Sequence, residues 1–216
     1  LQWRCHFMQK FDDEHSMEFK NINRAYDSIR LNHDENLLKK WRDGRTGIPI
    51  VDACMRCLDQ TGYLNFRMRA MIVSFAAFNL WQDWKYFSHH LAKKFLDYEP
   101  GIHYSQIQMQ SAVTGINTVR IYNPVKNSTD LDPKGDFIKK WVSELESIPS
   151  EYIHEPWKMT KIEQKMYNFY IDKDYPYPII DLETSRKKAL EEIWKIRKSP
   201  KSKINATKIL EKHVNK

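Results

Sequence analysis

The chain of 216 residues is poor in cysteine and has no long apolar run. Its three cysteines, Cys5, Cys54 and Cys57, are too few for a disulfide framework or for a four-cysteine iron–sulfur cluster. No stretch approaches the roughly 20 apolar residues that cross a bilayer, and the amino terminus does not have the pattern of a cleavable leader. We therefore expect a soluble protein without membrane contact in a reducing compartment, cytoplasmic or, in a eukaryote, nuclear.

Glycine is also scarce, with six residues, and none of them forms a Gly-rich phosphate loop. Cys54 and Cys57 have C-x-x-C spacing, but they fall within an expected helix and no second pair exists, so we expect no metal site. The length fits one domain over 1–216 without internal repeats. Because the chain has no initiator Met and opens on amphipathic residues such as Leu1 and Trp3, this domain is expected to be incomplete at its amino end.

The positive net charge is confined to the carboxy-terminal part of the chain. The formal charge is +7, and residues 186–216 contain eleven Lys and Arg against three Glu, a net of +8, which leaves −1 for residues 1–185. A Lys-rich helix that is merely solvated explains this distribution, and an extension that contacts phosphates is the alternative.

Apolar residues recur at helical spacing almost throughout, which predicts an all-α fold, a single bundle-like domain. Asp34 is expected to cap a helix that runs through Trp41, and Pro49 to begin a helix that ends at Gly62. The further expectations, in chain order, are a long central helix over 65–96, an irregular connection over 98–124, a helix that starts at 132–133, an extended linker over 175–178, and a basic final helix over 182–216.

Arg67 and Arg69 stand near the start of the expected central helix, in a largely apolar segment. Burying a guanidinium is unfavourable unless an anion accompanies it, so a paired carboxylate or an anionic ligand is implied. At spacing i and i+2 the two side chains point about 200° apart, so they cannot bind one anion together. Asp97 and Glu99, which follow the helix, are the natural partners.

Several motifs in this order resemble the flavin-binding helical domain of the photolyase/cryptochrome family. The motifs are Arg45-Thr46-Gly47-Ile48-Pro49-Ile50-Val51-Asp52-Ala53, the run from Tyr63 to Phe75, Trp81-Gln82-Asp83-Trp84-Lys85, and Arg120-Ile121-Tyr122-Asn123-Pro124. The resemblance implies the C-terminal FAD-binding domain of that family, without its α/β antenna domain, and FAD as the cofactor.

By this resemblance, Arg69, Asp97 and Glu99 surround the isoalloxazine and ribose of FAD. A buried Arg–Asp pair that ties helix to loop is the structural alternative. His103 is expected in a loop where the family usually has an asparagine facing the flavin N5, and an exposed loop histidine is the alternative. If His103 faces N5, its imidazole would titrate near neutral pH, which an amide does not do.

Asn65 and Phe66 are two further residues expected at the cofactor. The family motif often reads Trp-x-His-Asn-Arg where this chain has Tyr63-Leu64-Asn65-Phe66-Arg67, so Phe66 replaces an asparagine of the pocket. For DNA binding, the resemblance points to Trp3, Arg4, Arg67 and Arg120. Trp3 would offer a ring face to a flipped-out pyrimidine pair, although a core tryptophan is the alternative.

The family's Trp-x-Trp before a Thr-Gly pair is missing here. This chain has Ile107-Gln108-Met109-Gln110 at that place, so the lesion-stacking tryptophan and the first member of the electron-transfer chain are both absent. Trp84 matches the middle member of that chain. A route for photoreduction would therefore depend on Trp84, Trp81 or Tyr104.

Three functions remain open at this stage. The first is a light-driven DNA repair enzyme, a deoxyribodipyrimidine photolyase, in which reduced FAD splits a pyrimidine dimer in damaged DNA by electron transfer. The second is a cryptochrome-type blue-light photoreceptor that signals through a protein partner, which the lost tryptophan favours. The third is a family remnant that binds neither flavin nor DNA.

Overall fold

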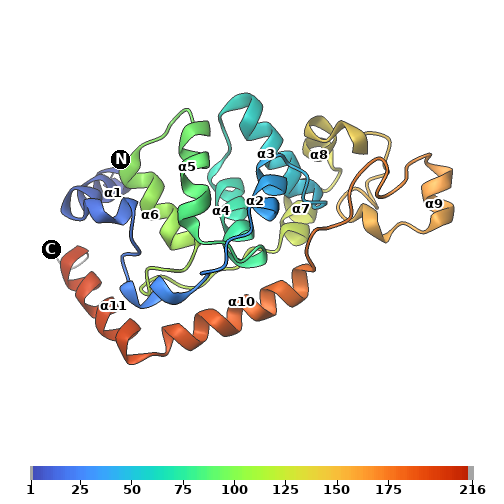
Figure 1. Cartoon of the computed structure of the whole chain (residues 1–216). Coiled ribbons are helices and arrows are strands. Elements are labelled where there is room, and N and C mark those ends of the chain that lie inside the picture. The colour runs from blue at the N-terminus through green and yellow to red at the C-terminus, as the bar shows by residue number, and fades with distance from the viewer. Residues whose placement is uncertain (1, 214–216) are drawn as a thin grey trace.

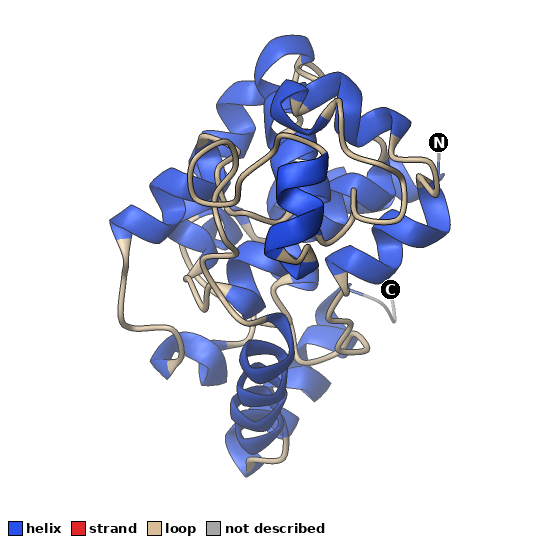
Figure 2. Ribbon diagram, turned by 90° about the vertical axis from the view of Figure 1, so that its right-hand side faces the viewer, coloured by secondary structure: helices blue, strands red, loops and turns tan. Residues whose placement is uncertain are grey.

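The computed structural model describes residues 2–213, and the regular elements of that part of the chain are all helices (Figure 2). The α-helices are α1 (Gln2–Asp13), α2 (Glu35–Arg42), α3 (Pro49–Thr61), α4 (Phe66–Ser74), α5 (Trp84–Lys94), α6 (Pro100–Gln110), α7 (Pro124–Leu131), α8 (Asp136–Trp141), α9 (Lys161–Met166), α10 (Leu182–Arg197) and α11 (Pro200–His213). Short helices of other types are η1 (His15–Glu18), η2 (Arg24–Ser28), η3 (Phe75–Asn79), η4 (Ser143–Leu145) and η5 (Pro156–Lys158). The all-α prediction is confirmed, and no helix of the described part is long and apolar enough to span a membrane.

The helices pack around α3, α4 and α5, with α1 and α6 side by side at one end and α8 against α3 toward the other (Figure 1). The close approach of α1 to α6 depends on Gly101, where a Cβ would lie 2.9 Å from the backbone of Met8 and Phe7. The long helix α10 runs along η3, and α11 turns back toward α1. The largest fully buried side chains of the core are those of Trp41, Trp84, Tyr26, Tyr175, Phe75 and Phe78.

The expected starts of two helices are confirmed. The Asp34 side chain accepts a hydrogen bond from the backbone N–H of Leu37 and so caps α2. Pro49 occupies the first turn of α3, and Gly62 ends that helix in the left-handed conformation with φ of 68°.

The single helix expected over 65–96 is wrong. The segment forms α4, the π-helical turn η3, an irregular stretch and α5. Trp81 has a φ of +55°, which interrupts the helix, and the Asp83 side chain accepts from the backbone N–H of Lys85 to begin α5 anew. The apolar character of both halves concealed this break, because each half is buried against the same core.

The irregular connection expected over 98–124 is also wrong in its first half, which forms α6. Glu99 caps this helix and Pro100 begins it, a start signal that the sequence does contain. A second unexpected helix, α7, begins at Pro124 after the cap Asn123. The helix expected to start at 132–133 begins at 136 instead, because the carboxylate of Asp132 accepts from the backbone N–H groups of its first turn.

The basic helix expected over 182–216 is two helices. Helix α10 ends at Arg197, and Pro200 begins α11 in a new direction (Figure 1), so one continuous amphipathic face is not formed. Residues 214–216 of the expected helix lie outside the described residues. The linker expected over 175–178 contains no helix, and its first residue, Tyr175, forms an isolated bridge with Ile171. The extended character of the linker is thus confirmed.

A buried carboxylate, Asp52, fastens the segment before α3 to the carboxy-terminal linker. Its Oδ1 accepts from Thr46 N at 2.7 Å and Thr46 Oγ1 at 2.6 Å, and its Oδ2 accepts from Gly47 N at 3.1 Å and the Tyr175 hydroxyl at 2.5 Å. Burial raises the pKa of Asp52 to about 6, and these hydrogen bonds oppose that rise. Gly47 has a φ of +76°, and a Cβ there would lie 2.3 Å from the carbonyl oxygen of Tyr177.

We predict that Asp52→Ala lowers the free energy of unfolding by about 3 kcal/mol or more, because it leaves four donors without their acceptor. The matched control is Asp130→Ala, which removes only an exposed pair with Lys126 and should change stability by less than about 0.5 kcal/mol. Urea unfolding of both variants measures the difference. Equal effects would show that the Asp52 network does not hold these segments together.

Candidate functional site

A pocket lies between α4 and α6, with a charged rim. Its apolar floor is formed by Ala70 and Val73 of α4 and by Ile102 and Ile107 of α6. Side chains from the start of α4, the segment after α5 and the outer turns of α6 complete the lining: Phe66, Arg69, Phe95, Asp97, Tyr98, Glu99, His103, Gln106 and Gln110. The enclosed volume is about 100 Å³.

Arg69 and Asp97 form an ion pair at this rim, as expected from the sequence. Arg69 Nη1 lies 3.0 Å from Asp97 Oδ1, and Arg69 Nε donates to the carbonyl oxygen of Leu64 at 2.6 Å. The guanidinium carbon lies 4.2 Å from the centre of the Phe95 ring and 5.5 Å from that of Tyr63. The cation is thus stabilised by a carboxylate, a carbonyl and two ring faces, while the Asp97 side chain stays 58% exposed and accessible from the pocket.

Glu99 lines the same pocket but also has a structural role. Its two carboxylate oxygens accept from the backbone N–H groups of Gly101 at 3.2 Å and Ile102 at 2.8 Å. A negative charge at the amino end of a helix is stabilised by the helix dipole. Glu99 therefore fixes the start of α6 and, through it, the position of that helix across the pocket from Arg69.

His103 lies in the first turns of α6 and not in a loop, and it is buried rather than exposed. Its Nε2 lies 2.9 Å from the carbonyl oxygen of Ser88, which can only accept, so this nitrogen carries the proton. Burial is the main cause that lowers the pKa of His103 to about 4, and the nearby Arg69 adds to it. The expected titration near neutral pH is therefore wrong: at pH 7 this imidazole is neutral.

Asn65 and Phe66 differ in their relation to the pocket. Asn65 Oδ1 accepts from the backbone N–H of Met68 at 3.0 Å and caps α4, and its side chain is not part of the pocket lining. Phe66 lies on the rim with its ring exposed to solvent.

Trp84 is buried, and a series of rings connects it to the pocket. Its indole N–H donates to Asn21 Oδ1 at 2.7 Å, and its ring centre lies 6.3 Å from that of Tyr104. The Tyr104 ring lies 5.0 Å from that of His103, which lines the pocket. Tyr104 also donates its hydroxyl hydrogen to Glu18 Oε1 at 3.2 Å.

Trp81 lies next to a buried cation. The guanidinium carbon of Arg30 lies 4.8 Å from the Trp81 ring centre and 5.1 Å from that of Phe78. Arg30 is 3% exposed, and within the described chain none of its three side-chain nitrogens has a hydrogen-bond partner. Burial lowers the pKa of Arg30 to about 9. A cation over the ring face opposes removal of an electron from Trp81.

Gln108, which lies where the Trp-x-Trp motif is missing, has a structural role. Its Nε2 donates to the carbonyl oxygens of Met17 at 2.7 Å and Lys20 at 2.9 Å, and its Oε1 accepts from the backbone N–H of Ile22 at 2.8 Å. This buried amide satisfies three backbone groups of the segment after α1, which an indole could not do. The sequence carried no signal for this role.

The four residues expected to bind DNA do not share one cavity. Arg67 and Arg120 line one hollow, whereas Trp3 lines another, between α1, α6 and α11, and Arg4 is exposed on α1 without lining either. The reason is the packing of α1 on α6, which holds Trp3 away from the start of α4. Trp3 is 75% exposed, so it is not a core residue.

The hollow at Trp3 contains two residues that sequence analysis missed. Lys10 is only 9% exposed, and burial lowers its pKa. His213 is 8% exposed, and burial together with Lys10 and Lys212 lowers its pKa. Lys10 recurs with Phe7 and Phe11 on the inward face of α1, a periodicity that could have indicated its burial.

The chain belongs to the family described as the FAD binding domain of DNA photolyase, which it matches over residues 1–195. This match confirms FAD as the cofactor that the resemblance implied. Helix α11 lies beyond the matched residues.

Relatives named as photolyases and relatives named as cryptochromes are both similar to this chain. It is 37% identical over 193 residues to a deoxyribodipyrimidine photo-lyase of Alkalihalophilus pseudofirmus, covering 88% of this chain and 40% of that protein. It is 30% identical over 183 residues to a cryptochrome DASH of Natronomonas pharaonis, covering 85% and 39%. A bacterial class III photolyase from Agrobacterium tumefaciens has a similar structure, with a TM-score of 0.84, 30% identity, and coverage of 91% and 41%. The chain thus spans about two fifths of the length of these relatives.

The residues of the α4–α6 pocket fit one side of a flavin ring. The buried Gln106 Oε1 has no hydrogen-bond partner among the described residues, and with the Asp97 carboxylate and the Arg69 guanidinium it provides acceptors and a donor for a polar heterocycle. The apolar floor suits the face of such a ring. Since a cavity of about 150 Å³ encloses one benzene ring, a volume of about 100 Å³ cannot enclose three fused rings. The pocket therefore has room for one side of such a ring system and not for all of it.

We predict that the protein loses stability as the pH falls from 6.5 towards 4, partly through His103. Its folded pKa of about 4 lies below the unfolded value of roughly 6.5, so neutral His103 stabilises the fold above pH 6.5 and that contribution is lost on acidification. His103→Asn should reduce the loss over this range by up to roughly 3 kcal/mol. Denaturant unfolding at a series of pH values tests this, with His89→Asn at an exposed position as the control. Parallel stability–pH curves for wild type and His103→Asn would contradict the burial argument.

Proposed function

We propose that this chain is part of a light-driven DNA repair enzyme that splits pyrimidine dimers with FAD. The observation that carries the proposal is the Arg69–Asp97 pair on the rim of a pocket with an apolar floor, in a chain of the photolyase FAD-binding family. When bound and reduced, FAD supplies a light-driven electron to the dimer and takes it back after the ring splits.

The chain's own residues would bind and orient the flavin. Asp97 accepts from an N–H at the ring edge, Arg69 contributes positive charge beside it, and Glu99 holds α6 in place behind the pocket. His103, neutral at pH 7 with its proton on Nε2, offers Nδ1 as an acceptor and neither gains nor loses charge across the physiological range. Asn65 would contribute indirectly, because its side chain caps α4, on which Arg69 lies. Phe66 would cover the flavin at the rim of the pocket.

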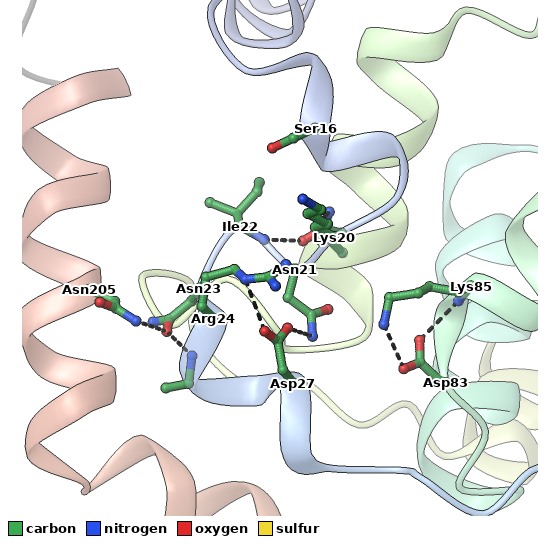
Figure 3. A network of polar contacts seen from close by, with 12 residues as sticks. Ser16, Lys20, Asn21, Ile22, Asn23, Arg24, Asp27, Asp83, Lys85 and Asn205 are labelled. Carbon is green, nitrogen blue, oxygen red and sulfur yellow. Dashed lines mark hydrogen bonds and ion pairs between the residues drawn. The ribbon is translucent and has the colours of Figure 1, made fainter.

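For electron supply to the flavin, Trp84 is the better candidate than Trp81. Both have a cation near the ring, but Lys85, which lies 5.7 Å from the Trp84 ring centre, is paired with Asp83 at 3.0 Å (Figure 3), whereas Arg30 has no ion pair within the described residues. Tyr104 lies between Trp84 and the pocket.

DNA would contact two separate hollows. Arg67 and Arg120 bind backbone phosphate at one, and Trp3, with Arg4 nearby on α1, offers an exposed ring at the other. Met109 and Asn117 line both the Trp3 hollow and a smaller one that includes Arg120, so a third hollow lies between the two.

A cryptochrome-type photoreceptor with a protein partner is the second candidate. It is favoured by Gln108 and Gln110 at the place of the missing tryptophans, because neither can stack on a flipped-out base as an indole does. A remnant without flavin is not proposed, because the chain belongs to the family described as the FAD binding domain of DNA photolyase. The free thiols of Cys5, Cys54 and Cys57 suit a reducing compartment, cytoplasmic or nuclear, in each case.

We predict that the full-length, FAD-loaded protein binds a duplex with one thymine dimer more tightly than the intact duplex. The lesion is partly unstacked and is easier to flip out, so the preference should persist when added salt weakens binding to both duplexes. Blue light should then restore the dimer to two thymines, with a dark sample as the control. Equal affinities at two salt concentrations and no restoration would reject repair and favour the photoreceptor.

A further inference from the structure

The hollow that contains Arg67 and Arg120 takes its basic residues from four segments of the chain. Arg67 comes from the start of α4, Arg120 from the segment after α6, Lys126 and Asn127 from α7, and Arg186 from α10. Its volume is about 920 Å³. Arg186 belongs to the basic carboxy-terminal stretch, and neither the motifs nor the family resemblance assigns it a role.

The charged residues of this hollow fall into two groups. Three of them are paired: Lys126 with Asp130 at 2.9 Å, Glu155 with Lys158 at 2.6 Å, and Glu183 with Lys187 at 2.7 Å. The three arginines, Arg67, Arg120 and Arg186, make no ion pair or hydrogen bond to any other described residue. Because the acids on the hollow are already neutralised by lysines, three guanidinium charges remain without a counter-charge.

Two further features favour an anionic ligand with polar atoms. The amino end of α7 faces the hollow, since the residues from Asn123 to Asn127 line it, and a helix amino terminus attracts negative charge. The Nδ2 of Asn127, which lines the hollow, is a donor that has no hydrogen-bond partner among the described residues, so it is available to a phosphate oxygen.

We propose that Arg186 of α10, together with Arg67, Arg120 and the amino end of α7, forms a binding site for the phosphodiester backbone of a DNA strand. Guanidinium groups bind phosphate oxygens in a bidentate manner, and three arginines without an ion pair among the described residues, lining one hollow of this size, suit a chain of phosphates better than a single ion. The site deepens the proposed DNA function, and it assigns part of the carboxy-terminal basicity to DNA rather than to solvation. Helix α10 lies along η3, so Arg186 is carried on a rigid element.

The first test is the salt dependence of binding to intact duplex DNA, measured in the dark on the full-length, FAD-loaded protein. Arg186→Gln should weaken binding about three- to tenfold and make the slope of log K against log salt shallower by about 0.9, the value for one lost phosphate contact. The matched control is Lys188→Gln, which removes the same charge from α10 on a face about 200° away and should leave the slope unchanged. Equal slopes for wild type and Arg186→Gln would overturn the proposal.

The second test identifies the source of the phosphate. In NMR spectra of the arginine Nε–H groups, the tetranucleotide TpTpTpT, with three phosphodiesters, should shift the signals of Arg67, Arg120 and Arg186 together. Shifts with inorganic phosphate but not with the tetranucleotide would show a free-phosphate site and overturn the assignment to DNA, as would no shift with either. Neither test needs light or a lesion. An Arg186 effect without dimer repair would therefore retain this site and reject the repair function.

Discussion

The ion pair between Arg69 and Asp97 is the interaction on which the rest of the site depends. A guanidinium that is largely removed from water needs an anion, and Asp97 supplies it from the segment that leads into α6. The contact of Arg69 with the Phe95 ring and with the carbonyl oxygen of Leu64 fixes its direction. Helices α4 and α6 are separated in the chain by α5, and this ion pair links the start of α4 to the segment that leads into α6. The pocket lies between the two helices that are linked in this way.

Buried polar groups position the surrounding segments in a similar way. Asp52 ties the loop before α3 to the linker at Tyr175, and Gln108 ties α6 to the segment after α1. Each makes several hydrogen bonds to backbone or hydroxyl groups, four for Asp52 and three for Gln108, so that no buried oxygen or nitrogen of either side chain is left without a partner. Arg30 is the contrast: among the described residues its guanidinium nitrogens have no hydrogen-bond partner, and it lies over the Phe78 and Trp81 rings with Asp83 as a more distant negative charge.

Features of the fold and site that depend on local sequence signals or on pairing of opposite charges could be predicted from the sequence. The cap at Asp34, the helix start at Pro49 and the pairing of Arg69 with an acid after the helix are of this kind. The break at Trp81 could not be predicted, because an apolar pattern continues on both sides of it and only the positive φ reveals it. The neutral state of His103 depends on burial and on a carbonyl from another helix, so periodicity contains no information on it. The placement of Arg186 beside Arg67 likewise arises from the packing of distant segments. The roles of these residues toward flavin and DNA, and the single-domain organisation, stay predictions.

The central claim is that the wall formed by Arg69 and Asp97 holds the flavin, and the affinity of the full-length apoprotein for FAD tests it most directly. Arg69→Gln and Asp97→Asn should each weaken FAD binding by on the order of tenfold or more, since each removes a charge-assisted contact. Arg67→Gln changes the same charge two residues away, at a different hollow, and should leave the affinity within about twofold. Unchanged affinity in the first two variants, in protein that unfolds at the wild-type temperature, would contradict the account.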